Sequence, residues 1–252
     1  MRSVLAQNYS LIEILVSDHA SSDESVNLVR KFNDPRIRLT HLSDGHTAAD
    51  NWNSCVAEAK GTYVKLLCQD DILKPDSIRI QVDALESHPG SSFCFGPRDV
   101  ISPRGRRLLK GRSGYSGPTI VNRDSFLPNS IRSGTNVFGE PCAVLMVRDA
   151  LKSAGPFSGS YLIDLNMWNK LWKIGPAIYV EQSLSQFRIS NQSWTTKLKN
   201  VQSEQMREYL HSFTAEDSHL LSISDIETGI DNAKKLAIRR SILTSLIEVF
   251  RL

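Results

Sequence analysis

Along the first seventy residues, short apolar runs typical of strands alternate with the spacing of apolar residues typical of amphipathic helices. Short apolar runs rich in β-branched residues predict strands at 11–16, 37–42 and 63–68. Between them lie two helical patterns, one opened by a capping box at Ser21–Glu24 and one that ends at Gly61. Strands that alternate with amphipathic helices predict an α/β fold, with a mainly parallel sheet covered by helices.

The pattern continues less regularly to about residue 196. Further helices are predicted at 75–88, 148–153 and 164–174, and further strands at 92–95, 142–147 and 177–180. The segment 98–117 is basic and rich in Gly and Ser, which predicts a loop. Beyond residue 197 the sequence contains only helix signals, including an apolar stripe of Leu236, Leu243, Ile247 and Phe250.

These patterns divide the 252 residues into one large domain and an appendage. We expect the α/β domain to cover residues 1–196 and a helical C-terminal extension to cover 197–252. The extension would pack on the domain or on a second copy of the chain. With 40% hydrophobic residues the chain has enough apolar material for a sizeable core, which excludes a disordered protein.

Charge and cysteine content indicate which partners and which cellular compartment to expect. Thirty Lys and Arg against 27 Asp and Glu leave a net charge of +3, and the basic residues lack interleaved aromatic residues, so nucleic acid is not an expected partner. The four cysteines form no CxxC pair, which favours a reducing compartment. No apolar stretch approaches a membrane span. We expect a cytoplasmic protein, with peripheral contact at the inner face of the membrane left open because 104–112 is basic.

Acidic residues follow two of the predicted strands. Asp18 comes after the first strand, and Asp70 and Asp71 come after the third. In open α/β sheets, ligands bind outside the carboxyl ends of the strands. Adjacent carboxylates suit Mg²⁺ or Mn²⁺, which take one or two carboxylates together with substrate phosphates. A nucleotide diphosphate would supply those phosphates.

Several segments together resemble family 2 glycosyltransferases. They are Ile12–Asp23, Asn51-Trp-Asn53, Tyr63–Asp71, Gly139–Cys142, Gly155-Pro-Phe157, Asp164–Trp168 and Phe187-Arg188, in the order that the family shows. The resemblance covers about residues 2 to 196. It implies a GT-A type fold and inverting transfer of a sugar from a nucleotide-diphosphate donor, most simply a UDP-sugar. The acceptor would be a hydroxyl of a glycan or lipid-linked saccharide in cell-surface polysaccharide synthesis.

The resemblance also assigns roles to individual residues. Asp18 would contact the nucleobase, Asp70 and Asp71 would meet ribose, diphosphate and the metal, with Asp71 as metal ligand, and Asp164 would be the general base. Each has a plainer reading: Asp18 as a turn residue, the pair as a solvated strand end, and Asp164 as a helix cap.

Three weaker candidates have equally plain alternatives. Asn53 belongs either to the nucleotide site or to a helix surface, and Glu140 faces the sugars or forms a turn. Trp168 stacks on a sugar or, as we favour from its spacing with Trp172, packs in the core.

The sequence departs from the family pattern in three places. The family's first strand would precede Ser3 by about 20 residues, and Gln69 stands where the acidic element would carry a third carboxylate. Near the base, Asn166 stands where a second Asp is usual, and Ser190 stands where a His often follows Phe-Arg. The alternative to an enzyme is therefore a catalytically inactive, truncated glycosyltransferase-like protein that binds a sugar or a partner.

Overall fold

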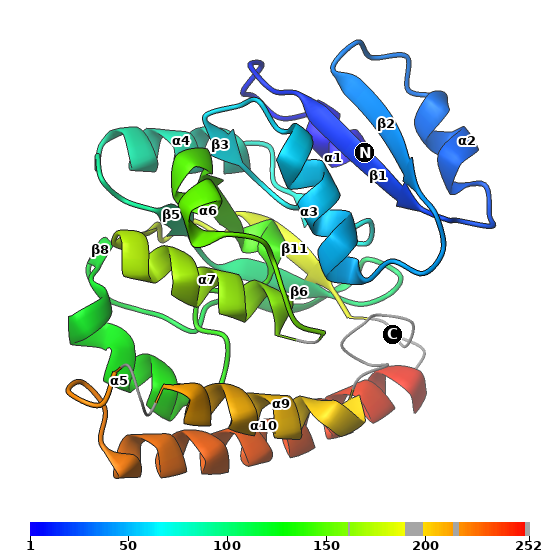
Figure 1. Ribbon diagram of the computed structural model, residues 1–252. Helices are drawn as coiled ribbons and strands as arrows, with labels where there is room; N and C mark the ends of the chain where they lie inside the picture. Colours follow the sequence, from blue (N-terminus) through cyan, green and yellow to red (C-terminus); the bar gives the residue numbers. More distant parts are fainter. Residues whose placement is uncertain (161, 190–198, 214–216, 250–252) are drawn as a thin grey trace.

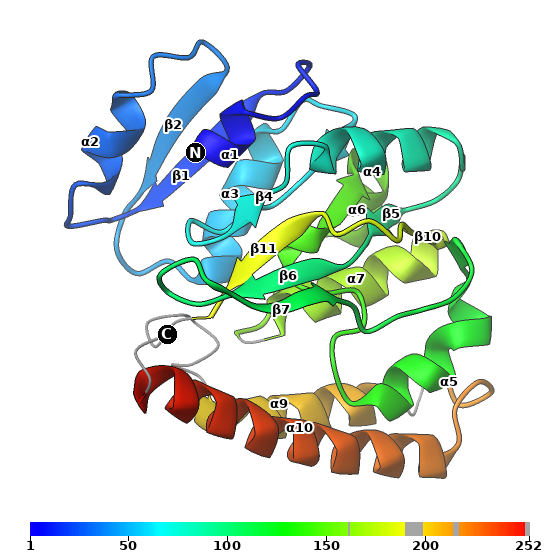
Figure 2. The same ribbon diagram turned by 180° about the vertical axis from the view of Figure 1, so that it is seen from behind.

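The computed structural model describes residues 1–160, 162–189, 199–213 and 217–249. Its strands form three sheets of two, five and four strands. Figures 1 and 2 show the two-stranded sheet at one corner of the molecule, the other two sheets in the middle, and a pair of long helices along the opposite side.

The two-stranded sheet forms the N-terminal corner. After the short helix α1 (Arg2–Leu5), β1 (Ile14–His19) and β2 (Ile37–Leu42) pair in parallel and are connected by α2 (Ser25–Arg30). The predicted end of the first strand is wrong, because Asp18 lies inside β1, opposite His41. The predicted capping box is also wrong. The carboxylate of Asp23 accepts the backbone N–H of Ser25 at 2.9 Å instead, two residues away.

Helix α3 has the capping box that α2 lacks. In α3 (Ala48–Glu58), Thr47 Oγ1 accepts the N–H of Asp50 at 3.2 Å, and the Asp50 carboxylate accepts the N–H of Thr47 at 2.8 Å. The apolar face of α3 carries Trp52, whose ring meets Phe157 edge-on at a centroid distance of 5.5 Å. This contact joins α3 to the loop that precedes the helix α7 (Ile163–Ile174).

The five-stranded sheet forms the centre of the core. Its order is β3 (Tyr63–Val64), β9 (Val144–Val147), β5 (Phe93–Phe95), β10 (Ala177–Tyr179) and β8 (Ile120–Val121). The predicted strand 63–68 is wrong beyond Val64. β3 pairs antiparallel with β9 and not with β1 or β2, so this sheet is mixed: β5 and β10 pair in parallel beside antiparallel neighbours.

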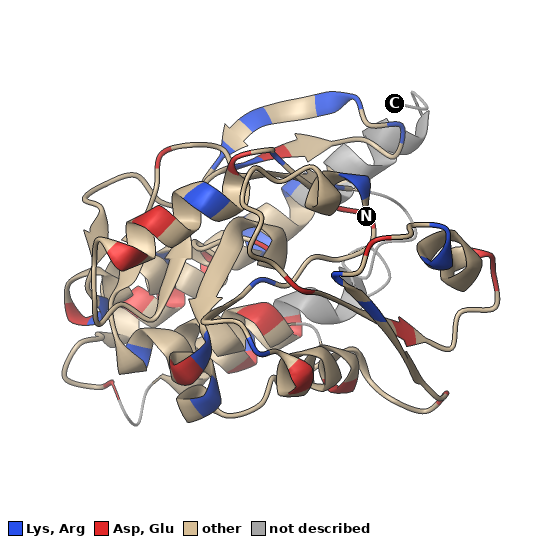
Figure 3. Cartoon of the chain, turned by 90° about the horizontal axis from the view of Figure 1, so that it is seen from above, with Lys and Arg blue, Asp and Glu red and all other residues tan. Residues whose placement is uncertain are grey.

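The four-stranded sheet includes a hairpin that the sequence did not reveal. Its order is β4 (Ile72–Leu73), β11 (Ser185–Arg188), β6 (Arg98–Ile101) and β7 (Arg107–Arg112). The predicted loop over 98–117 is therefore wrong. Arg98 and Asp99 are buried beside charged partners. The sequence of this buried strand is therefore partly charged and does not show the apolar pattern that predicts a strand. The Lys and Arg residues of β7 lie along the outer edge of this sheet (Figure 3).

Helices cover the two larger sheets. They are α4 (Ser77–Glu86), α5 (Arg123–Ser133), the 3₁₀ turn η1 (Pro141–Ala143), α6 (Arg148–Ala154) and α7 (Ile163–Ile174). The helix predicted at 164–174 is confirmed to within one residue. Its buried face packs on the central sheet, where the Trp168 ring stacks on Phe93 at 6.1 Å.

The C-terminal helices α9 (Lys199–Ser212) and α10 (Ile223–Val249) lie beside α5 (Figure 1). The Arg123 guanidinium binds both carboxylate oxygens of Asp217, at 2.8 and 2.7 Å. The α5 end at Gly134 approaches the α10 backbone at Gly229 so closely that neither position has room for a Cβ. In the predicted stripe, the Leu243 and Ile247 side chains and Phe250 lie outside the described residues. No helix in the described part of the chain is long and apolar enough to cross a bilayer.

Candidate active site

Asp71 is fixed where β4 meets β11. The antiparallel pairing of Ile72 with Gln186 places Asp71 beside the end of β11, where its Oδ1 accepts the N–H of Arg188 at 3.0 Å. The guanidinium of Arg188 donates back to the carbonyl of Asp70 at 2.9 Å. Burial raises the pKa of Asp71 to about 7, and the neighbouring charge of Asp70 adds to that effect.

Asp164 lies in the first turn of α7. Its Oδ1 accepts the N–H of Leu165 at 2.8 Å, and its Oδ2 accepts a hydrogen bond from Asn136 Nδ2 at 3.0 Å. Leu162 occupies the cap position, so Asp164 is not the helix cap of the plainer reading. Burial raises the pKa of Asp164 to about 7, against the effect of these two hydrogen bonds. Its carboxyl group can therefore accept a proton near neutral pH.

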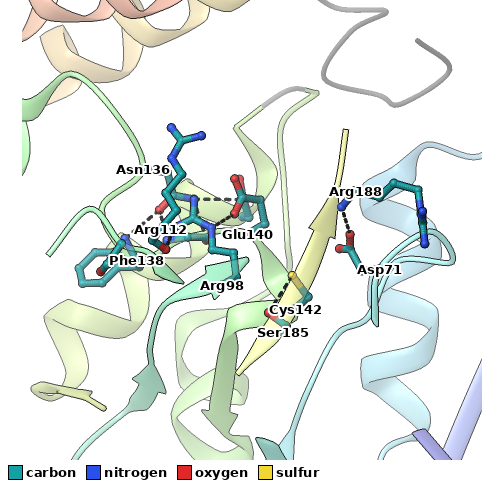
Figure 4. Close-up of polar contacts among 12 residues, drawn as sticks. Asp71, Arg98, Arg112, Asn136, Phe138, Glu140, Cys142, Ser185 and Arg188 are labelled. Atoms are coloured by element: carbon teal, nitrogen blue, oxygen red, sulfur yellow. Dashed lines mark hydrogen bonds and ion pairs between the residues drawn. The ribbon is translucent and has the colours of Figure 1, made fainter. Parts of the chain in front are cut away.

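The acidic groups that the sequence proposed for the chemistry lie in one region. Burial raises the pKa of the Cys68 thiol, and Asp71, Asp70 and Asp164 raise it further through their charges. Glu140 likewise adds, after burial, to the raised pKa of both Asp71 and Asp164. Contacts connect two of these carboxyls through one loop, because the Cys142 thiol hydrogen-bonds to Asp71 and Asn136 joins Gly139 of the same loop to Asp164. Figure 4 shows Asp71, Cys142 and Glu140 gathered around β11.

Glu140 forms an ion pair with the buried Arg98 of β6. Burial alone would raise the pKa of Glu140, but the charge of Arg98 and its hydrogen bond outweigh burial and lower it. Arg98 also donates to the carbonyl of Arg112 at 3.2 Å. Glu140 thus supplies a permanent negative charge that is largely balanced by Arg98. Among the residues that the structure describes, Asp71 and Asp164 form no ion pair of this kind.

Asp18 and Asn53 have partners outside this cluster. Asp18 Oδ2 is 3.3 Å from His41 Nδ1, and hydrogen bonding from Ser21 lowers the pKa of Asp18. Among the described residues, no hydrogen bond or ion pair joins Asp18 to Asp70, Asp71 or Asp164. The Asn53 amide exchanges two hydrogen bonds with the backbone of Phe157, at 2.9 and 2.8 Å, which is a structural role for it.

Trp168 belongs to the core. Its side chain is 0% exposed, and its indole Nε1 donates to the carbonyl of Gly139 at 3.0 Å. Because the residue is fully buried and Phe93 stacks on its ring, the indole is not accessible to a sugar. The structure therefore fits the packing alternative that its spacing with Trp172 favoured.

Asp71 is the residue best suited to hold a divalent cation. Asp71 is 7% exposed, and its carboxyl accepts the backbone N–H of Arg188 and a hydrogen bond from the Cys142 thiol, neither of which carries a charge. A cation beside it would favour the ionised form. The part of the chain that the structure describes contains no group of three metal-ligating side chains. Mg²⁺ and Mn²⁺ commonly bind through one or two carboxylates and the substrate phosphates, so the donor set present fits.

Sequence reasoning missed two residues that organise this region, Arg98 and Asn136. Arg98 was placed in a solvated loop, although a charged residue followed by an apolar Val-Ile pair is compatible with a strand. Asn136 stands three residues before Gly139, and Asn before a glycine turn is a known signal for side-chain to backbone hydrogen bonding. That signal predicts a turn but does not reveal its partner Asp164.

Comparison with known proteins places these features in a family. The model of glycosyl transferase family 2 matches residues 1–155. The chain is 32% identical over 193 residues to the UDP-Glc:alpha-D-GlcNAc-diphosphoundecaprenol beta-1,3-glucosyltransferase WfgD of Escherichia coli, which covers 76% of this chain and 71% of that protein. The chain spans only 12% to 36% of the length of four other curated relatives.

Solved structures show the same fold at low sequence identity. S. aureus TarS 1-349 in complex with UDP superposes with a TM-score of 0.63 at 14% identity, over 92% of this chain and 64% of TarS 1-349. The mannosyltransferase PcManGT of Pyrobaculum calidifontis, in complex with GDP-Man and Mn²⁺, gives 0.58 at 15% identity, over 98% and 70%. The GT-A type fold expected from the resemblance is confirmed, and the chain belongs to glycosyl transferase family 2.

Proposed function

We propose that the protein is an inverting, hexosyltransferase-type glycosyltransferase that moves a sugar from a nucleotide-diphosphate donor to an acceptor hydroxyl. The observation that carries this proposal is a pair of carboxyls connected by the loop 136–142, the buried Asp71 and the half-buried Asp164, and burial raises the pKa of each to about 7. A general base works best when its pKa lies near the operating pH. A buried carboxylate whose hydrogen-bond donors are uncharged is suited to a cation and the diphosphate that accompanies it.

In the proposed reaction Asp164 is the general base. The acceptor hydroxyl oxygen attacks the anomeric carbon from the face opposite the diphosphate and gives its proton to Asp164. The bond between the anomeric carbon and the diphosphate oxygen breaks, and the nucleotide diphosphate leaves with that electron pair. One displacement of this kind inverts the anomeric configuration.

The remaining acidic residues would bind the donor. Asp70 and Asp71 would face the ribose and diphosphate, and Asp71 would hold Mg²⁺ or Mn²⁺. When bound, the metal would supply a Lewis acid that stabilises charge on the leaving diphosphate. Asp18 would contact the nucleobase as a permanently ionised acceptor, Asn53 would support the donor side through the loop at Phe157, and Glu140 would face the donor or acceptor sugar.

A UDP-sugar is the proposed donor, and a glycan or lipid-linked saccharide of the cell surface is the proposed acceptor. The names of relatives support this choice: WfgD uses UDP-Glc and a diphosphoundecaprenol-linked acceptor, and TarS binds UDP. The protein would then act in the cytoplasm at the inner face of the membrane. Peripheral contact there is supported by α10, whose exposed Ile238 and Ile242 lie near Lys234 and Lys235.

Calorimetric titration of UDP in the presence of Mn²⁺ tests the proposal. We expect binding that Asp71→Asn weakens at least about tenfold, because the substitution removes a charged ligand. Asp149→Asn is the matched control, since that carboxylate is 85% exposed on α6 and should leave affinity unchanged. Absence of binding for UDP and for GDP would overturn the proposal and favour the inactive, sugar- or partner-binding alternative.

A further inference from the structure

The loop before η1 is organised around the side chain of Asn136. Its Oδ1 accepts the backbone N–H groups of Phe138 and Gly139, both at 3.1 Å. Its Nδ2 donates to the carbonyl of Gly139 at 2.9 Å and to Asp164 Oδ2 at 3.0 Å. All four hydrogen-bonding positions that an amide typically uses are therefore occupied, two as acceptor and two as donor (Figure 4).

This network fixes which way the Asn136 amide points. If the amide were turned over, its NH₂ group would face two N–H donors, and its oxygen would face a carbonyl and a carboxylate. Both contacts would be repulsive, so only one orientation is compatible with the loop. Asp164 Oδ2 consequently always receives an N–H from this side.

The same loop is attached to α7 at a second point. The Gly139 carbonyl also accepts the indole N–H of Trp168, which lies one helical turn after Asp164. Gly139 has φ +93°, and a Cβ there would come within 3.2 Å of the Arg98 guanidinium and 3.3 Å of Ala143, so the close turn requires glycine. Two hydrogen bonds, from Asn136 to Asp164 and from Trp168 to the Gly139 carbonyl, thus fix the position of the loop relative to α7.

We infer that Asn136 is a positioning residue that holds the Asp164 carboxyl in one orientation and sets the pH range in which it can accept a proton. This inference rests on the proposed function of Asp164. A hydrogen bond donated to a carboxylate favours its charged form, which opposes the effect of burial at Asp164. Without Asn136 the base would be protonated at a higher pH and free to rotate about its χ angles.

Other groups also act on Asp164 and remain in place when Asn136 is changed. Glu140, in the same loop, adds negative charge, while the charge of Arg98 on β6 lies within reach of Asp164 and opposes it. The Cys68 thiol and the Tyr209 hydroxyl of α9 face it as neutral groups whose own pKa values burial raises. Because these groups stay in place, a change in the pKa of Asp164 on substitution of Asn136 can be attributed to Asn136.

The variant Asn136→Asp separates positioning of the base from folding of the loop. An aspartate keeps the two acceptor bonds from Phe138 and Gly139 but cannot donate, and its charge lies beside Asp164. We expect the acid limb of the kcat profile to move up by about one pH unit or more, with the KM for the donor changed less than about threefold. An acid limb that coincides with that of the unmodified protein overturns the inference.

Trp168→Phe is the matched control. It removes the other hydrogen bond that the Gly139 carbonyl accepts from α7 and leaves the Asp164 contact intact. We expect a lower Tm with the acid limb unchanged. If Trp168→Phe moves the acid limb as far as Asn136→Asp does, general loosening of the loop explains the shift and the specific role of Asn136 is wrong.

A measurement without substrate keeps the test independent of the proposed function. The carboxyl pKa of Asp164 is read by ¹³C NMR of labelled aspartate and assigned by the signal lost in Asp164→Asn. We expect it to rise in Asn136→Asp, and by a smaller amount in Asn136→Ala, which removes the donor without adding charge. An unchanged pKa in either folded variant contradicts the inference, whereas a protein without transferase activity contradicts only the proposed function.

Discussion

The N-terminal corner and the centre of the molecule place the same residue type in opposite environments. In β1, α2 and β2, Ile14 is the one buried residue, and Asp18 is held by partly exposed groups that lower its pKa. In the centre of the molecule, β5 is 0% exposed throughout, and Asp71 beside β11 and Asp164 in α7 have raised pKa values. The difference teaches that the surroundings of an aspartate decide the direction in which its pKa moves.

The largest contrast should appear in stability. Trp168→Ala removes a ring that is 0% exposed, so we expect the free energy of unfolding to fall by about 3–5 kcal/mol. Val16→Ala in the partly buried β1 should cost less than about 1.5 kcal/mol. Urea denaturation followed by circular dichroism measures both. Equal losses would contradict the division into a buried centre and a loosely packed corner.

Breaking the attachment of the C-terminal helices should give the next largest loss of stability. Asp217→Ala leaves the Arg123 guanidinium, 11% exposed, without its partner, and we expect a loss of about 3 kcal/mol. Asp231→Ala breaks the exposed pair with Lys234 and should cost less than about 1 kcal/mol. Because the Arg123 hydrogen bonds lower the pKa of Asp217, its stabilisation is present at neutral pH and disappears on acidification. A pH-independent difference between Asp217→Ala and the parent would contradict this account.

The corner should matter for donor affinity more than for folding. If Asp18 contacts the nucleobase, Asp18→Asn should weaken UDP binding about tenfold, because a charged hydrogen bond is lost. The Tm should change little, since the contacts of Asp18 within the described ranges are exposed hydrogen bonds with Ser21 and His41. Undiminished UDP affinity in calorimetry would return Asp18 to its plainer role as a residue of a strand end.

The last effect is a pH-dependent change in Tm. The folded pKa of Asp164 lies above the value of an unfolded aspartate, so the native state binds more protons between about pH 4 and 7, and stability falls as pH rises through that range. Asp164→Asn removes this effect. We expect its Tm to exceed that of the parent protein at pH 8 and to match it near pH 4. A variant that is less stable at pH 8 would show that the carboxylate is not strained by burial.

The sequence predicts the elements that repeat a simple period. The strand at 37–42, the strand at 177–180 and the helix at 164–174 have clear apolar patterns, and each is found to within about one residue. The hairpin formed by β6 and β7 was missed because its buried residues include Arg98 and Asp99. Their partners, Glu140 and Lys74, are far away in the sequence, so no local pattern announces their burial.

The candidate site shows the same limit. Asp71 and Asp164 could be selected from local sequence and the family resemblance, and the structure brings them into one region. Asn136 could not be selected, because its importance depends on a contact 28 residues away. The raised pKa values could not be foreseen either, since they follow from burial by elements that the sequence does not place beside the carboxyls.

The most direct test of the central claim compares two measurements on Asp164→Asn. The account predicts that UDP affinity in the presence of Mn²⁺ stays within about threefold of the parent, while kcat falls by about 10²–10⁴, the usual contribution of a general base. Binding and turnover that decline together would contradict the separation of donor binding at Asp71 from proton transfer at Asp164.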